Sequence, residues 1–384
     1  MSRPEHGGWA ISDRDRRILV IGGTRGTGLL IARRLAAQGR TVRVLARDPA
    51  RARPRVGNDL ELVQGDITCR ESLLPAIRGV GHIIFTAGCR SGRPARERTI
   101  RATEYEGVIH TLDVARQEGF SGRFLYMTAT GVLTPSLMAT LLNAFKGNTL
   151  RWRLRAEEEI RASGIEYSVI RAGVLVNRPG GRRRIEVTQG VTPMSPRFIA
   201  RADVAEVFVA ALDHPRAAGA SFDVVWAARG GEGIGGGPPS WRELLMPLQA
   251  DRCRVFFYGL FMDQDLLRAK GLAPRDAELA SVEGLELRIG QRAALVPAPR
   301  SRVHGVVLSL RREELTSLYA EPGLSLYVPE PVRARLATGD IRAVQCYNLR
   351  EAPAPTDRNP EYALKLRAVA ERVGLPAEYI ASIR

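Results

Sequence analysis

A glycine-rich segment near the start of the chain separates a short apolar stretch from a helical pattern. Residues 22–28 read GGTRGTG, residues 17–21 (RILVI) have the composition of a buried strand, and residues 29–38 (LLIARRLAAQ) carry the apolar spacing of a helix. Glycines in this position allow a tight turn and bring the backbone close to a pyrophosphate, which the free N–H groups and dipole of the helix attract. The segment predicts a dinucleotide-binding loop made by Gly22, Thr24, Arg25, Gly26, Thr27 and Gly28.

The pattern of apolar runs after this loop alternates between strands and helices. Such alternation predicts a parallel sheet with helices on both faces, the doubly wound α/β class. The expected strands are residues 17–21, 41–46, 60–63, 82–86, 123–127 and 167–170, and the expected helices are residues 29–38, 108–117, 156–162 and 204–212.

The length and one break in the pattern predict two domains. A chain of 384 residues is long for one ordinary domain, and residues 229–240 (RGGEGIGGGPPS) cannot build a helix or a strand. After the break, further short strands and a helix at 362–372 predict a smaller α+β domain. We expect a disordered leader at 1–15, a nucleotide-binding domain at 16–251 and a second domain at 252–384.

The end of the second expected strand bears on the choice of dinucleotide. An acidic residue there would accept hydrogen bonds from the ribose 2′-OH of NAD(H), whereas an arginine accommodates the 2′-phosphate of NADP(H). Arg47 stands at this place, Arg25 of the glycine loop could add a second donor, and Asp48 is expected to point away or to cap the next turn. The sequence therefore favours NADP(H), with NAD(H) as the alternative.

These motifs resemble the short-chain dehydrogenase/reductase superfamily, particularly its atypical NAD(P)H-binding branch, over about residues 17–248. The likeness rests on the glycine loop and on residues 161–173 and 201–206. It implies an adenine contact and a segment at the end of the fourth strand, and the residues at these places are Asp66, Ile67, Thr86, Ala87 and Gly88.

The resemblance also implies a Tyr-xxx-Lys pair on the helix after the fifth strand, where Tyr protonates a carbonyl oxygen. Aligning the motif places Arg151 at the Tyr and Arg155 at the Lys. Arginine is no general acid at neutral pH, because its pKa stays above about 12. Thr128 or Thr130 could take the family's Ser position. Two alternatives stay open: an atypical NADP-dependent oxidoreductase, or a non-catalytic NADP(H) sensor or scaffold.

The second domain resembles the gamma-glutamylcyclotransferases. The family's substrate segment corresponds to residues 256–261 (FFYGLF), and residues 303–307 and the tail from 359 to 380 also match. The resemblance implies that the substrate-binding residues are Tyr258, Gly259, Leu260 and Phe261, with Leu260 in place of the usual Ser or Thr.

The reaction implied by this family is cyclisation of a gamma-glutamyl group to 5-oxoproline. One carboxylate can take the proton of the attacking amine and return it to the leaving amine. The family's catalytic Glu directly precedes a Gly, where this chain has Pro322 before Gly323. Three alternatives remain open: Glu321 is catalytic after a local shift, Glu330 substitutes for it, or the activity is lost.

The overall composition indicates a soluble protein that acts on small molecules. The net charge is +16, but the arginines are spread along the chain, which favours a solvated surface over a nucleic-acid site. The four cysteines lie far apart, so neither a metal site nor a disulfide framework is expected, and a cytoplasmic location fits best. No membrane span is expected, since no uncharged apolar stretch is long enough.

Overall fold

The computed structural model describes residues 17–89, 97–133, 148–190, 197–227 and 241–384, and it divides the chain into two compact units. The first unit holds residues up to Leu154 together with Ile165–Gln249, and the second holds Arg155–Gly164 together with Ala250–Arg384. The expected leader (1–15) and the break at 229–240 lie outside the described residues. The boundary expected between residues 251 and 252 stays a prediction.

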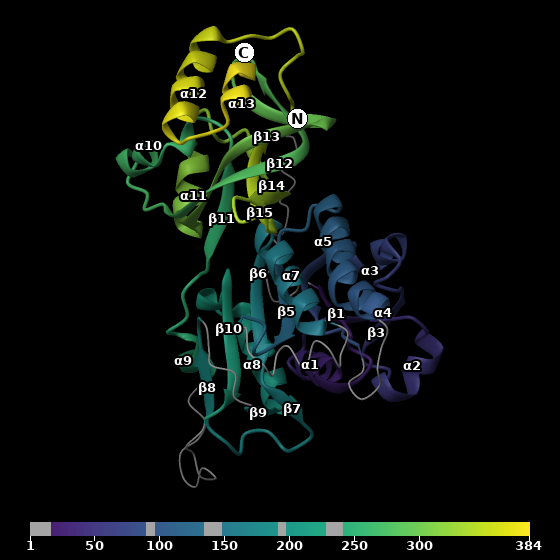
Figure 1. Cartoon of the computed structure of the whole chain (residues 1–384). Coiled ribbons are helices and arrows are strands. Elements are labelled where there is room, and N and C mark those ends of the chain that lie inside the picture. Colours follow the sequence, from purple (N-terminus) through teal and green to yellow (C-terminus); the bar gives the residue numbers. More distant parts are fainter. Residues whose placement is uncertain (1–16, 90–96, 134–147, 191–196, 228–240) are drawn as a thin grey trace, which may run out of the picture. The chain divides into compact units, whose positions relative to one another are not determined.

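The first unit is built on an eight-stranded sheet, which confirms the doubly wound α/β class (Figure 1). Every neighbouring pair is parallel except the last, in which β8 runs antiparallel to β10. In spatial order the strands are β3 (Glu61–Gln64), β2 (Val42–Ala46), β1 (Arg17–Ile21), β4 (Val80–Phe85), β5 (Arg123–Ala129), β6 (Glu166–Ala172), β10 (Ala220–Trp226) and β8 (Ile185–Thr188).

Helices lie on both faces of this sheet (Figure 1). One face packs against α1 (Gly26–Ala37) and α8 (Arg201–Asp213) in a continuous apolar core. The other face carries α5 (Gly107–Gln117) and α7 (Thr149–Ala162). The remaining elements are α2 (Pro49–Val56), α3 (Leu74–Ile77), α4 (Glu97–Arg101), α9 (Trp241–Leu245), short helical turns at Arg70–Leu73, Ala102–Glu106 and Pro215–Ala217, and the parallel pair β7 (Val174–Val176) with β9 (Phe198–Ala200).

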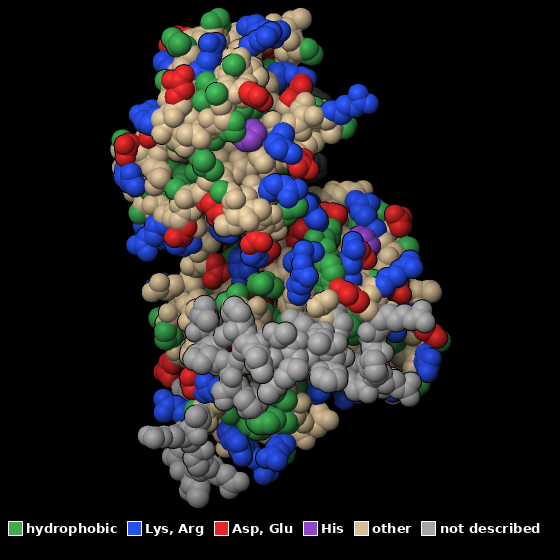
Figure 2. All heavy atoms as spheres, viewed as in Figure 1, with side chains coloured by type: hydrophobic (Ala, Val, Ile, Leu, Met, Phe, Trp, Pro, Cys, Tyr) green, Lys and Arg blue, Asp and Glu red, His purple; other side chains and the backbone are tan. Residues whose placement is uncertain are grey.

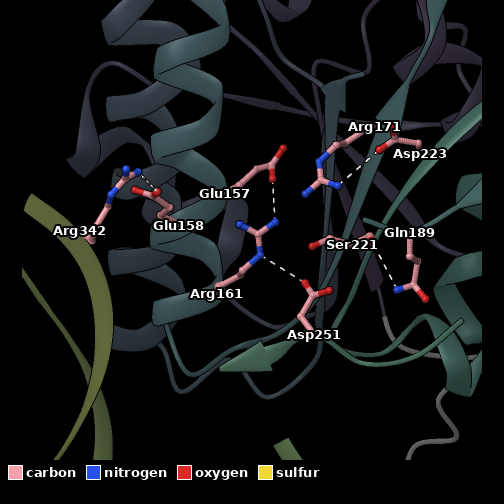
Figure 3. Close-up of polar contacts among 9 residues, drawn as sticks. All are labelled: Glu157, Glu158, Arg161, Arg171, Gln189, Ser221, Asp223, Asp251 and Arg342. Atoms are coloured by element: carbon pink, nitrogen blue, oxygen red, sulfur yellow. Dashed lines mark hydrogen bonds and ion pairs between the residues drawn. The ribbon is translucent and has the colours of Figure 1, made fainter. Parts of the chain in front are cut away.

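The last turns of α7 group with the second unit. Arg161 donates to Glu157 Oε2 at 2.7 Å and to Asp251 Oδ2 at 3.3 Å, and the close-up in Figure 3 shows the guanidinium between the two carboxylates. Glu157 is completely buried. These contacts join the last turns of α7 to Asp251, close to the start of the long segment of the second unit.

The second unit is a closed five-stranded barrel with helices packed around it, which agrees with the α+β class expected for this part. Its core is formed by residues of the second unit alone, among them Phe256, Val307 and Leu366. The barrel strands in order are β11 (Arg252–Phe257), β13 (Ala293–Arg311), β12 (Arg275–Ile289), β14 (Tyr327–Leu336) and β15 (Ile341–Leu349), and the helices are α10 (Gln264–Ala269), α11 (Arg312–Ala320), α12 (Pro360–Arg372), α13 (Ala377–Ser382) and a turn at Leu260–Met262.

Candidate functional site

The glycine loop is packed tightly on the end of β4. Gly22 has a φ of +84°, and a Cβ there would lie 2.7 Å from Ala87 N and 2.8 Å from Thr86 Oγ1. A Cβ on Gly28 would lie 2.4 Å from both Gly22 O and Thr86 Oγ1. The Thr86 hydroxyl is itself held by donating to Ile21 O at 3.0 Å. These two places favour glycine, because a Cβ would meet backbone atoms and a hydroxyl that is held by a hydrogen bond.

The middle of the loop is open and lies at the N-terminus of α1. Gly26 has a φ of +56° and is exposed, and no atom of the described residues lies within 4 Å of the place of a Cβ. The N-cap residue Arg25 makes no side-chain cap, so the first N–H groups of the helix remain free of that contact. The Thr27 hydroxyl is buried and has no hydrogen-bond partner among the described residues. Open backbone, uncapped N–H groups and an unpartnered hydroxyl suit a bound pyrophosphate.

The end of β2 offers a free guanidinium beside this loop. Arg47 is exposed and makes no hydrogen bond or ion pair within the described part of the chain. Asp48 caps α2, with Oδ1 accepting from Arg51 N at 3.0 Å. The expected role of Asp48 as a cap is therefore confirmed. The carboxylate is occupied by the helix, whereas the guanidinium is available to a ligand.

The end of β3 reaches the same edge of the sheet. Asp66 Oδ1 accepts from Thr68 N at 2.9 Å and from Thr68 Oγ1 at 2.8 Å. Ile67 is buried, its carbonyl oxygen lies 2.9 Å from His110 Nδ1, and its side chain packs on Gly107. Because parallel strands end at one edge, Asp66 and Ile67 share that edge with the glycine loop, as the family resemblance implies.

A buried carboxylate organises the end of β4. Glu104 is 2% exposed and lies in the π-helical turn Ala102–Glu106 that precedes α5. It accepts from Arg153 Nε at 2.5 Å, Arg153 Nη2 at 3.2 Å, Thr149 Oγ1 at 2.7 Å and the backbone N–H of Cys89 at 3.1 Å. The guanidinium also lies beside Gly88, 3.2 Å from where a Cβ would be. Glu104 thus ties α7 to the segment that follows β4.

The residues of α7 that contact Glu104 are not the two that the family motif singled out. The sequence alignment put Arg151 and Arg155 at the Tyr and Lys positions, but Arg151 is exposed. Thr149 and Arg153, also four residues apart, are the pair that faces Glu104. Trp152, next to Arg153 in this helix, is buried and its ring lies 5.5 Å from that of Tyr105, which directly follows Glu104.

The pair at the site holds no proton donor suited to neutral pH. The Thr149 hydroxyl is engaged with Glu104. Burial would lower the pKa of Arg153, but the adjacent carboxylate of Glu104 outweighs it and raises that pKa above its usual range. Thr128 is 2% exposed, and its hydroxyl has no partner among the described residues, so it can hold an oxygen atom but cannot act as an acid. Thr130 is only half-buried.

In the second unit, the expected substrate segment follows β11. Gly259 precedes the turn at Leu260–Met262, and Leu260 and Phe261 are half-buried against the core. The Tyr362 hydroxyl of α12 lies over Gly259, 2.9 Å from where a Cβ would be. Sequence reasoning quoted Tyr362 only as part of the family's tail and missed its place at this segment.

Tyr258 points into the barrel. Its hydroxyl lies 3.2 Å from Asn348 Oδ1, 3.2 Å from Tyr347 O and 3.4 Å from Ala293 O. Asn348 in turn donates from Nδ2 to Glu330 Oε1 at 2.9 Å. A tyrosine, an amide and a carboxylate therefore form one connected group in the barrel.

Glu321 lies elsewhere. Its Oε2 is 2.5 Å from Lys270 Nζ, and its side chain is 39% exposed. It lines a surface hollow of about 270 Å³ that includes none of the residues 258–261; the hollow's lining comprises Lys270, Gly271, Leu272, Glu313, Glu314, Ser317, Leu318 and Glu321. Among the described residues, the contact recorded for the Glu321 carboxylate is with Lys270, and none is recorded with the expected substrate segment.

Two further findings concern the described residues as a whole. They contain no group of three or more His, Cys, Asp or Glu side chains arranged to hold a metal ion. None of the helices in the same residues is long and apolar enough to cross a membrane.

Comparison with known proteins agrees with both halves of this picture. A family model described as NAD(P)H-binding matches residues 22–215, and one described as gamma-glutamyl cyclotransferase, AIG2-like, matches residues 255–364. Sanguinarine reductase of Eschscholzia californica is 29% identical over 251 residues, which cover 56% of this chain and 90% of that protein. An uncharacterised chloroplastic protein of Arabidopsis thaliana is 28% identical over 215 residues, which cover 51% of this chain and 65% of the relative.

A solved structure, a putative NAD-dependent epimerase/dehydratase from Bacillus halodurans, is 20% identical with a TM-score of 0.49, covering 61% of this chain and 100% of its own. Because the first family model matches residues 22–215, half of the chain, the chain belongs to the NAD(P)H-binding family. It also carries a C-terminal gamma-glutamyl cyclotransferase, AIG2-like domain at residues 255–364.

Proposed function

We propose that the first unit binds NADP(H) and that Arg47 holds the 2′-phosphate. The observation that carries this proposal is the exposed guanidinium of Arg47 at the end of β2, which pairs with no described residue. The neighbouring carboxylate of Asp48 already caps α2. A charge-assisted contact between guanidinium and phosphate is strong and geometrically specific. Gly22, Gly26 and Gly28 would hold the pyrophosphate, and Asp66 and Ile67 would border the adenine.

Arg153 and Thr128, near the ends of β4 and β5, limit the chemistry that a bound dinucleotide could carry out. NADPH supplies a hydride when bound. Arg153 and the Thr128 hydroxyl can orient an oxygen atom, but neither can protonate it. We therefore propose either hydride transfer to an acceptor that needs no proton from the protein, or a non-catalytic sensor of NADP(H). The reductase activity in the name of the Eschscholzia relative supports the first of these.

Equilibrium titration of the full chain with NADPH and NADH tests the cofactor proposal. We expect NADPH to bind roughly tenfold to a hundredfold more tightly, because a hydrogen bond to a charged group contributes about 1.5–3 kcal/mol. Arg47→Ala should abolish this preference. Arg51→Ala, an exposed arginine four residues later, is the matched control and should retain it. Equal affinities in the unchanged protein would refute the proposal.

As a second candidate function, we propose that the barrel converts gamma-glutamyl compounds to 5-oxoproline. The family match supports the reaction class, and the group formed by Tyr258, Asn348 and Glu330 supplies a carboxylate joined by hydrogen bonds to the expected substrate segment. Incubation with gamma-glutamyl amino acids and gamma-glutamyl amines, followed by measurement of 5-oxoproline, tests it. Absence of release from every such compound would refute it.

We further propose that the protein acts on small molecules in the cytoplasm rather than on nucleic acid. Positive charge gathered in one stripe is typical of nucleic-acid binding. On the face shown in Figure 2, Lys and Arg side chains are scattered among Asp and Glu side chains. A filter-binding assay with single- and double-stranded DNA and RNA at physiological salt should detect no specific retention.

A further inference from the structure

The barrel holds a carboxylate on the inward side of β14. Val332, Ala334 and Leu336 are buried, while the residues between them, Arg333 and Arg335, are exposed. Side chains alternate along a strand, so Glu330 shares the inward register of the buried residues.

Its neighbours confirm this orientation. Glu330 pairs in register with Cys346 of β15, which is completely buried. The pKa of the Cys346 thiol is raised, mainly by burial and to a smaller extent by the negative charge of Glu330. Because residues directly opposite each other on paired strands have side chains on the same face, Glu330 lies on the same inner side of the barrel as Cys346.

Asn348 holds this carboxylate in a fixed relation to Tyr258. The amide is clamped to the backbone of Leu295, which donates to Oδ1 at 2.9 Å and accepts from Nδ2 at 2.9 Å. From this fixed position Nδ2 also donates to Glu330 Oε1 at 2.9 Å, and Oδ1 accepts from the Tyr258 hydroxyl at 3.2 Å. The Asn348 side chain therefore bridges Glu330 and Tyr258, and Tyr258 directly precedes Gly259.

The alternative carboxylate, Glu321, has no such hydrogen-bonded connection to Tyr258 among the described residues. Glu321 pairs with Lys270 and lines a hollow that includes no residue of the segment 258–261. Pro322, at the family's catalytic position, is exposed and cannot transfer a proton. Among the described carboxylates discussed for this reaction, Glu330 alone is connected to the expected substrate segment.

We propose that Glu330, and not Glu321, carries the proton in gamma-glutamyl cyclisation; this inference rests on the second function proposed above. The ionised Glu330 takes a proton from the substrate's α-ammonium group. The resulting amine nitrogen attacks the gamma-carbonyl carbon, and a new C–N bond forms.

The amide C–N bond of the leaving group then breaks, and its nitrogen takes up the proton carried by Glu330 and the second proton released by the attacking nitrogen. The products are 5-oxoproline and a free ammonium compound, and Glu330 is ionised again. Asn348 is a positioning residue that keeps the carboxylate oriented.

Paired substitutions in the full chain test this assignment. Glu330→Gln preserves shape but removes the base, so kcat for 5-oxoproline release should fall by about 10²–10⁴ with little change in KM. Glu321→Gln is the matched control and should retain activity within about threefold. The substitution should also leave the fold intact, because an exposed ion pair such as Glu321–Lys270 contributes little to stability. Thermal unfolding of both variants checks that each remains folded.

The outcomes separate the inference from the function on which it rests. The inference is supported if kcat falls in Glu330→Gln with little change in KM, while Glu321→Gln keeps its kcat. Turnover that survives Glu330→Gln, or that is lost in Glu321→Gln instead, overturns the inference and leaves the cyclisation function intact. If the unchanged protein releases no 5-oxoproline, the function and the inference are both wrong.

Discussion

Replacing Glu104 by Gln tests whether this buried carboxylate organises the cofactor site. All groups that contact its two oxygens are donors, from Arg153, Thr149 and Cys89. A glutamine would turn an N–H₂ group toward donors and leave Arg153 without its counter-charge. Removing one partner of a buried pair typically costs about 3–5 kcal/mol, and we reduce this to about 2–4 kcal/mol because the Arg153 side chain is 23% exposed.

The assay is thermal unfolding of the full chain, following the transition that NADPH shifts. For a unit of this size, the expected loss corresponds to roughly 5–15 °C in Tm. The double variant Glu104→Gln with Arg153→Met should recover part of the loss, because it removes the unpaired charge. A single variant as stable as the unchanged protein, or a double variant that is no better than the single one, would refute the reasoning.

The same substitution has a pH signature. Burial would raise the pKa of Glu104, but the charge and hydrogen bonds of Arg153 outweigh it, so the pKa is lowered overall. A lowered pKa means that the carboxylate stabilises the folded state above its unfolded pKa of about 4.3 and loses that contribution as pH falls through the folded pKa. Glu104→Gln should therefore flatten the acid side of the stability curve.

Further predictions concern the glycine loop and the chemistry at α7. Gly28→Ala should lose about 1–3 kcal/mol of stability and weaken NADPH binding in a titration, because its Cβ would meet Gly22 O and Thr86 Oγ1 at 2.4 Å. Gly39→Ala, at a φ of +78° with open space around it, should destabilise through backbone strain but keep its NADPH affinity. A screen of aldehydes, ketones and quinones with NADPH should show no fast carbonyl reduction, and robust turnover that survives Thr128→Ala and Thr149→Ala would contradict our account of the site.

Much of the first unit could be predicted because its signals are local in sequence. The glycine loop, Arg47 and the capping role of Asp48 each depend on residues within a few positions of one another. The register of α7 could not be predicted in this way. Arginines stand at 151, 153 and 155, and only the tertiary contacts of the helix, such as Trp152 against Tyr105, show that Arg153 is the one that meets Glu104.

The residues that sequence reasoning missed are those whose partners are distant in the chain. Glu104 meets Arg153 across 49 positions and sits in a π-helical turn that has no sequence signature. Tyr258 and Asn348 are 90 positions apart and meet only because the strands close into a barrel. The motif alignment pointed to Glu321, since it compares positions along the chain and not the directions of side chains.

The ³¹P resonance of the 2′-phosphate of bound NADP⁺, followed as a function of pH, tests the central claim most directly. A phosphate monoester has a second pKa of about 6, and an adjacent guanidinium favours its doubly charged form. If Arg47 holds this phosphate, the pKa in the complex lies below that of free NADP⁺, and Arg47→Ala returns it toward the free value. A bound 2′-phosphate that titrates as in free NADP⁺, or whose pKa is unchanged by Arg47→Ala, would contradict the assignment of this domain to NADP(H) through Arg47.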